Sequence, residues 1–186
     1  MKLLVKILFV VCALLLVRSV LSAAAVPSAV LSPDAVAYGT VVDAAKAAII
    51  ESFNSKDGGF VEYGGLIILR DGHYYYTTPV TQNNVDEVNY VYHHVDGQVA
   101  VAVYHIHPNR TQKDPHYSQF SDDDIKLVNR INRPSYVGID KDQYERAQRT
   151  LRVYNKGDPT ITEKTPFGSQ SHLYADGQLV MVLPPR

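Results

Sequence analysis

Residues 99–108, VAVAVYHIHP, pass from a continuous apolar run to two histidines that are separated by one residue. Such a run is typical of a strand that is buried on both faces. Because strand side chains alternate between the faces, His105 and His107 must share one of them. We expect that face to carry three valines as well, Val99, Val101 and Val103. Two imidazoles on one face at a strand end provide two of the ligands that a zinc site needs.

A helix is predicted from Ser121 to Asn132. Ser121 is a residue type that caps helices, acidic residues fill the first turn, and apolar residues recur at helical spacing. At about 100° per residue, Asp124 lies near the centre of the apolar stripe, whereas Asp122 and Asp123 lie on its flank or away from it. A carboxylate on the buried side of a helix has to be paired, protonated or bound to a metal.

Two interpretations of Asp124 are open at this point. In the first, Ser121 and Asp124 form a capping box, and the acid only closes the start of the helix. In the second, Asp124 is the third ligand of the metal site. The histidine pair shortly before the helix favours the second interpretation.

Glu62 stands at the start of another apolar stretch, VEYGGLIIL at residues 61–69. This is an unusual place for an acid unless its side chain faces a site. Two histidines, an aspartate and a nearby glutamate are the components of a catalytic zinc centre. Three protein ligands leave one coordination position for water, and the glutamate takes a proton from that water.

Three ordered blocks resemble the signature of the JAMM (MPN-type) zinc metallopeptidases, which is Glu-x-x-Gly-Leu/Ile, His-x-His-Pro and Ser-x-x-Asp. The corresponding blocks are Glu62-Tyr63-Gly64-Gly65-Leu66, His105-Ile106-His107-Pro108 and Ser121-Asp122-Asp123-Asp124. The resemblance covers roughly residues 35 to 155, judged by the order of the elements. The spacer between Pro108 and Ser121 is longer than is usual for the family.

The resemblance implies both a fold and a site. The implied fold is α/β (α+β), a single domain with a mixed central β-sheet flanked by helices, similar to the MPN and cytidine deaminase folds. The implied site holds Zn²⁺ through His105, His107 and Asp124. In it, Glu62 is the general base and acid, and Ser121 stabilises the tetrahedral intermediate. Domains of this kind also occur in bacterial toxin and effector systems.

The N-terminus has the three-part order of a secretory signal peptide. Lys2 and Lys6 precede an apolar run at residues 7–17, and small residues at 23–25 form a cleavage site. The run is shorter than the roughly 20 residues that span a bilayer, and an uncleaved signal-anchor is the alternative. We therefore expect a signal peptide at 1–25, a tether at 26–34 and a JAMM-like domain at 35–186. The domain is expected to be periplasmic or secreted, without a stable membrane span.

Cleavage after residue 25 makes the chain acidic. Lys and Arg number 18 against 19 Asp and Glu, and the signal contains three basic residues and no acid, which leaves a net charge of about −4. Because no basic stripe is present, nucleic acid is not expected as a partner. The one cysteine, Cys12, lies in the signal, so the mature chain is expected to have no disulfide.

Other elements are predicted from periodicity and turn residues. A helix is expected to begin at residues 33–34 and to run towards Phe53. His116, in the loop before Ser121, is expected near the metal. The remaining elements are strands. Strands at 66–69 and 73–78 are expected to form a hairpin around Asp71-Gly72, and strands at 173–174 and 179–183 a closing hairpin around Asp176-Gly177. Two further strands are expected at 135–139 and 150–155.

Three function classes are compatible with these residues. The first is a secreted zinc-dependent hydrolase of the JAMM type that cleaves a peptide or isopeptide bond in a peptide or protein substrate, for example a cell-wall peptide. The alternatives are a non-catalytic MPN-like binding module and a metal-sequestering protein. Glu62 favours the hydrolase, because water activation needs an acid at that position and metal capture does not.

Overall fold

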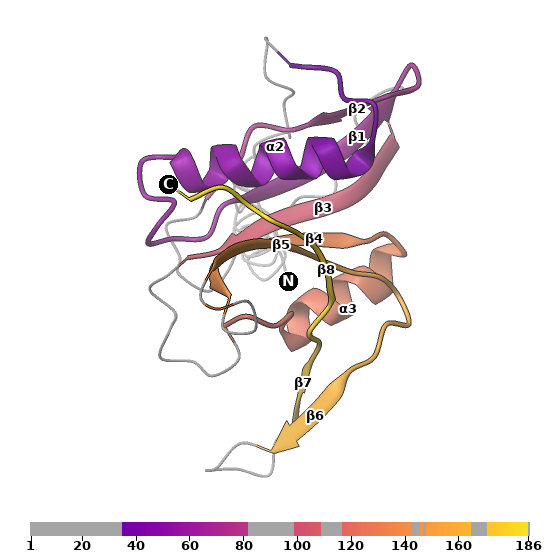
Figure 1. Ribbon diagram of the computed structural model, residues 1–186. Coiled ribbons are helices and arrows are strands. Elements are labelled where there is room, and N and C mark those ends of the chain that lie inside the picture. Colours follow the sequence, from indigo (N-terminus) through magenta and orange to yellow (C-terminus); the bar gives the residue numbers. More distant parts are fainter. Residues whose placement is uncertain are drawn as a thin grey trace, which may run out of the picture.

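The computed structural model describes residues 35–81, 99–108, 117–142, 146, 148–164 and 171–185. Within these residues the fold is α+β, with a curled mixed sheet and two helices (Figure 1). Six strands form the sheet in the order β2-β1-β3-β4-β5-β8, and β6 and β7 form a separate ribbon. The helices are α2 (Val41–Asn54) and α3 (Asp122–Ile131). The strands are β1 (Gly64–Arg70), β2 (His73–Tyr76), β3 (Val99–His107), β4 (Ser135–Asp142), β5 (Gln148–Tyr154), β6 (Ile161–Lys164), β7 (Ser171–Tyr174) and β8 (Gln178–Val182).

Strand β3 lies in the interior of the sheet and carries the histidine pair. It is antiparallel to β1 and parallel to β4, so the C-terminal ends of β3 and β4 reach the same edge of the sheet. Helix α3 lies between these two strands in the chain, as a parallel pair requires a crossover connection. The predicted strand at 99–107 and the predicted helix after Ser121 are confirmed, as is the mixed sheet flanked by helices.

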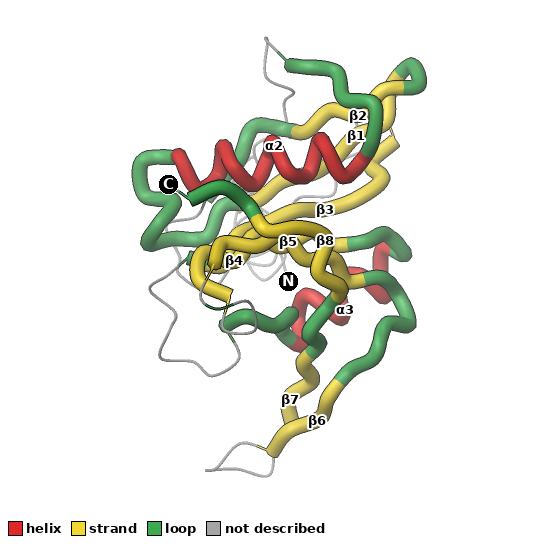
Figure 2. The backbone as a smooth tube through the Cα atoms, in the orientation of Figure 1, coloured by secondary structure: helices red, strands yellow, loops and turns green. Residues whose placement is uncertain are grey.

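The two helices cover opposite faces of the sheet (Figure 2). Tyr104 and Ile106 of β3 belong to the buried cluster that contains α2, whereas Val103 packs with apolar residues of α3. His105 and His107 continue the alternation of Val103, so they lie on the α3 face. This alternation brings the histidines to the face on which the acidic first turn of α3 lies.

A β-bulge changes the alternation earlier in β3. The register of β1 against β3 shifts between Ile67 and Ile68, and the ladder skips Val101. Val101 packs with the cluster on the α2 face. The expectation that Val101 shares the face of the histidines is therefore wrong, because the extra residue of a bulge reverses the alternation. Val103, which follows the bulge, does lie on the α3 face.

Helix α2 begins later than predicted. Its N-cap is Thr40, whose Oγ1 accepts a hydrogen bond of 3.1 Å from the N–H of Asp43. Tyr38, just before the cap, exchanges backbone hydrogen bonds of 2.9 and 3.0 Å with Tyr74 of β2. The backbone at Tyr38 is therefore extended along the edge of the sheet, so α2 begins only after it.

The closing hairpin predicted around Asp176-Gly177 is wrong. Strand β7 pairs with β6, which the sequence did not indicate, and β8 pairs with β5. Between them, Ala175 pairs with Phe120 in an isolated bridge. The chain therefore turns around Phe120 at Gly177, and the β6–β7 ribbon extends away from the sheet (Figure 1). The other predicted hairpin, β1–β2, is confirmed, with positive φ angles at Asp71 and Gly72.

Several predicted features lie outside the described residues. These are the signal peptide at 1–25, the tether at 26–34 and the loop histidine His116. Neither helix in the described part of the chain is long and apolar enough to cross a membrane.

Candidate metal centre

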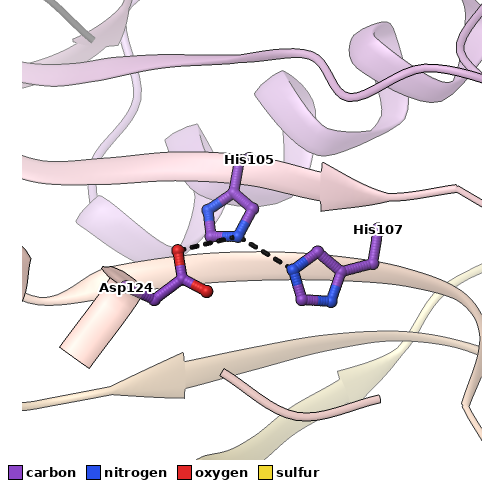
Figure 3. Close-up of side chains that lie close together, drawn as sticks. All are labelled: His105, His107 and Asp124. Carbon is purple, nitrogen blue, oxygen red and sulfur yellow. Dashed lines mark hydrogen bonds and ion pairs between the residues drawn. The ribbon is translucent and has the colours of Figure 1, made fainter. Parts of the chain in front are cut away.

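Three side chains from two elements converge on the α3 face of the sheet (Figure 3). His105 and His107 project from the end of β3, and Asp124 projects from the first turn of α3. The two histidine Nε2 atoms are 3.1 Å apart, and Nε2 of His105 is 3.3 Å from Oδ1 of Asp124. One ligand atom from each residue lies within 4.8 Å of the other two. The structure thus brings together the three residues that the sequence predicted as ligands.

The donor set fits a metal ion in both chemistry and spacing. Zinc binds imidazole nitrogen and carboxylate oxygen at about 2.0–2.2 Å in a tetrahedral arrangement, so neighbouring ligand atoms lie about 3.3 Å apart. The two shorter separations here, 3.1 and 3.3 Å, match that edge. His105 and His107 are buried, and electron-rich atoms that converge in a buried place favour a bound cation. The group could therefore bind a metal ion.

A backbone contact determines which nitrogen of His107 faces this group. Its Nδ1 lies 2.7 Å from the carbonyl oxygen of Tyr117. Because a carbonyl only accepts hydrogen bonds, Nδ1 carries the hydrogen and donates it. In the neutral ring Nε2, which lies 3.1 Å from Nε2 of His105, then carries a lone pair. Histidine ligands of metals are commonly oriented by a contact of this kind.

The shifted pKa values of His105 and Asp124 favour the protonation states that bind a cation. The pKa of His105 is lowered from 6.5 to about 4, mainly by burial; Asp124 opposes this shift, and the proximity of His107 adds to it. Burial by itself raises the pKa of Asp124, but the two histidines and the hydrogen bonds from Ser121 together bring it below 3.8. At neutral pH His105 is therefore neutral and Asp124 is ionised, which are the forms that bind metals.

Asp124 forms the capping box of the first interpretation, and its position is compatible with the second. Its Oδ2 accepts hydrogen bonds from the backbone N–H of Ser121 at 2.9 Å and from the Ser121 hydroxyl at 2.8 Å. The backbone N–H of Asp124 donates to Ser121 Oγ at 3.3 Å, which completes a capping box. Its Oδ1 faces His105. One carboxylate oxygen thus closes the helix, and the other is directed at the histidines. The structure places Ser121 beside Asp124, as the helix cap.

The two neighbouring acids lie away from the site. Asp122 and Asp123 both pair with Lys126, at 2.5 and 3.4 Å. The Asp123 side chain is 94% exposed. The helical phase predicted for Asp124 against its neighbours is therefore confirmed.

Glu62 lies at the edge of the same group. Tyr63 accepts a backbone hydrogen bond from Ile106, which continues the ladder of β1 one residue beyond Gly64 and places Glu62 across from His107. Oε1 of Glu62 is 4.0 Å from Nε2 of His107, and the residue is 8% exposed. We expected Glu62 to be the first residue of the strand, but the structure places it two residues before β1 begins.

The pKa of His105 leads to a prediction for the metal-free protein. Between pH 6.5 and about 4 the unfolded chain binds a proton at His105 that the folded chain does not, so stability must fall as the pH is lowered through this window. The loss can reach about 3 kcal/mol, at 1.36 kcal/mol per pKa unit. Urea unfolding with EDTA at several pH values measures it. A His105→Asn variant should show a flatter dependence, and an identical slope in that variant would contradict the prediction.

Comparison with known proteins does not assign the chain to a family. No protein-family model, no curated protein and no solved structure with which the chain was compared matches it. The likeness to the JAMM metallopeptidases therefore rests on the motif residues of the chain itself.

Proposed function

We propose that the protein is a zinc-dependent hydrolase of the JAMM type, with an MPN/cytidine-deaminase-like fold, that cleaves a peptide or isopeptide bond. The observation that carries this proposal is the position of Glu62. A buried carboxylate lies 4.0 Å from one member of a group of three side chains that could hold a metal ion. A glutamate beside such a group is the arrangement that hydrolytic zinc sites use.

Each residue has a distinct task in this proposal. His105, His107 and Asp124 would hold the zinc ion, which supplies Lewis acidity and brings the pKa of water towards neutrality. Glu62 takes a proton from the attacking water and returns it to the leaving amine. The buried side chains around these groups limit access of other water, which strengthens their electrostatic interactions.

A metal-sequestering protein and a non-catalytic MPN-like module are the alternatives. Two histidines and one aspartate are sufficient to capture a metal ion, and a binding module needs neither the metal nor the acid. The position of Glu62 supports the hydrolase over both, because an acid within reach of the ligand group serves proton transfer.

The proposal is tested by a search for turnover. The purified protein, loaded with zinc, is incubated with peptides, isopeptide-linked peptides and muropeptides, and products are identified by mass spectrometry. We expect cleavage of an amide bond that stops on addition of EDTA and returns with zinc. Stoichiometric zinc binding without cleavage of any of these classes would favour sequestration instead.

Ser121 is proposed to polarise the substrate carbonyl in addition to capping α3. For this its hydroxyl hydrogen has to leave Oδ2 of Asp124, while its backbone N–H continues to hold that oxygen at 2.9 Å. Ser121→Ala is then expected to lower turnover about 100- to 1000-fold, the typical effect of losing an oxyanion donor. Loss of the cap costs about 1 kcal/mol of stability. A loss of stability with unchanged turnover would leave Ser121 as a helix cap only.

A further inference from the structure

We propose that Tyr117 and Gln119 are positioning residues for His107. Both lie in the segment Tyr117–Phe120, and their contacts fix the orientation of the His107 imidazole in the metal site. The proposal rests on the proposed function, because it takes the three ligands to hold zinc. This segment precedes α3 and joins the end of β3 to distant parts of the chain. Its residues contact His107 at one end and the connection between β7 and β8 at the other.

The contact with His107 comes from the main chain. The carbonyl oxygen of Tyr117 accepts the hydrogen bond from Nδ1 of His107, at 2.7 Å. The position of this carbonyl therefore determines how the imidazole is turned and where its Nε2 points. Outer partners of this kind influence metal affinity strongly, because they fix both the tautomer and the orientation of the ligand.

The side chain of Tyr117 fixes that carbonyl to the sheet. Its hydroxyl donates a hydrogen bond to the carbonyl oxygen of Lys141, near the C-terminal end of β4. Strand β4 runs parallel to β3, and their ladder extends to the pair His107 and Ile139. The hydroxyl of Tyr117 is thus bound to β4, and its carbonyl contacts His107 on the neighbouring strand β3.

The second anchor lies two residues further along the chain. Nε2 of Gln119 donates a hydrogen bond of 2.7 Å to Oδ1 of Asp176, and Gln119 is 5% exposed. Phe120 exchanges backbone hydrogen bonds of 2.7 and 3.1 Å with Ala175. A Cβ on Gly177 would lie 2.4 Å from Cε2 of Phe120, so only a glycine permits this close approach.

The partner of Gln119 is itself held by the sheet. The carbonyl of Asp176 accepts a hydrogen bond of 3.4 Å from Arg152 of β5. Arg152 in turn forms an ion pair of 2.5 Å with Asp142, whose side chain is fully buried. A buried, paired arginine and aspartate form a rigid support. The hydrogen bond between Gln119 and Asp176 therefore holds the segment that orients His107 at a fixed position relative to the sheet.

Zinc affinity and the visible spectrum of the cobalt-substituted protein test this proposal, because a purely structural role would move neither. The test variants are Tyr117→Phe, Gln119→Ala and Asp176→Ala. Each is expected to weaken zinc binding about tenfold, the lower end of the effect of losing an outer partner. Each should also change the cobalt bands, since these report the geometry of the ligands. Asp176→Asn keeps an oxygen acceptor and is expected to behave like the unaltered protein.

Two control variants remove matched hydrogen bonds elsewhere. Tyr76→Phe removes a tyrosine hydroxyl bond to Glu51 of α2, and Gln178→Ala removes a glutamine bond to Asp158. Both should leave zinc affinity and the cobalt spectrum unchanged. The proposal is overturned if the test variants, like the controls, keep both the zinc affinity and the cobalt spectrum of the unaltered protein. If the unaltered protein binds no metal, the proposed function fails as well, and the two failures are thereby distinguished.

Discussion

Asp124→Ala is expected to weaken zinc binding by at least about 100-fold, because the loss of an outer partner alone already costs 10- to 100-fold. Asp124 supplies the one carboxylate among the three candidate ligands, with Oδ1 at 3.3 Å from His105. Its removal leaves two imidazoles, which bring no negative charge to balance a divalent cation. Metal analysis of the dialysed protein and competition with a chelating dye measure the effect.

The matched control is Asp123→Ala. Asp123 belongs to the same helical turn and also carries a negative charge, but its side chain is 94% exposed and directed to Lys126. This variant is expected to retain one equivalent of zinc. If Asp123 proves to be the sensitive position, Asp124 is not a ligand, and the geometry of the group has another explanation.

The capping box requires a second comparison for Asp124→Ala. The variant also removes the acceptor of the bonds from Ser121, which costs about 1 kcal/mol of stability with or without metal. Unfolding in EDTA isolates this part. Loss of a ligand instead removes the stabilisation that zinc gives to the folded protein, which is seen only when zinc is present.

The elements that carry the candidate ligands could be predicted because their signals are local. The alternation in residues 105–107 determines that both histidines face one side, and the helical period after Ser121 distinguishes Asp124 from Asp123. A third relation, that these two elements lie together, follows from the order of strand, helix and parallel strand. The candidate metal centre could therefore be assembled from short stretches of sequence.

The features that were predicted wrongly or not at all depend on contacts between residues that are far apart in the sequence. The bulge at Val101 arises from the pairing of β1 with β3, and α2 starts late because Tyr38 pairs with β2. The Asp176-Gly177 turn resembled a hairpin, but Phe120 occupies the place where the strands would meet. The carbonyl of Tyr117 has no sequence signature, because every residue has one. Such contacts appear only once the chain is folded.

Glu62→Gln is expected to slow turnover by at least about 100-fold, in the range that general acid–base groups contribute. The amide keeps the shape of the side chain and its hydrogen-bonding capacity, but it cannot take a proton. Oε1 of Glu62 lies 4.0 Å from His107, outside the group of three ligand atoms. The variant should therefore fold and bind zinc as the unaltered protein does. The decrease should appear in kcat, with KM little changed, because substrate binding does not need the base.

A second glutamate provides the control for this experiment. Glu51 of α2 accepts a hydrogen bond from Tyr76 and lies in the helix on the opposite face of the sheet from the histidines. Glu51→Gln is expected to leave turnover unchanged. If Glu62→Gln also retained full activity on a substrate cleaved by the zinc-loaded protein, proton transfer by Glu62 would be wrong. The metal group would then act with another base, because water attack on an amide still requires that its proton be removed and delivered to the leaving amine.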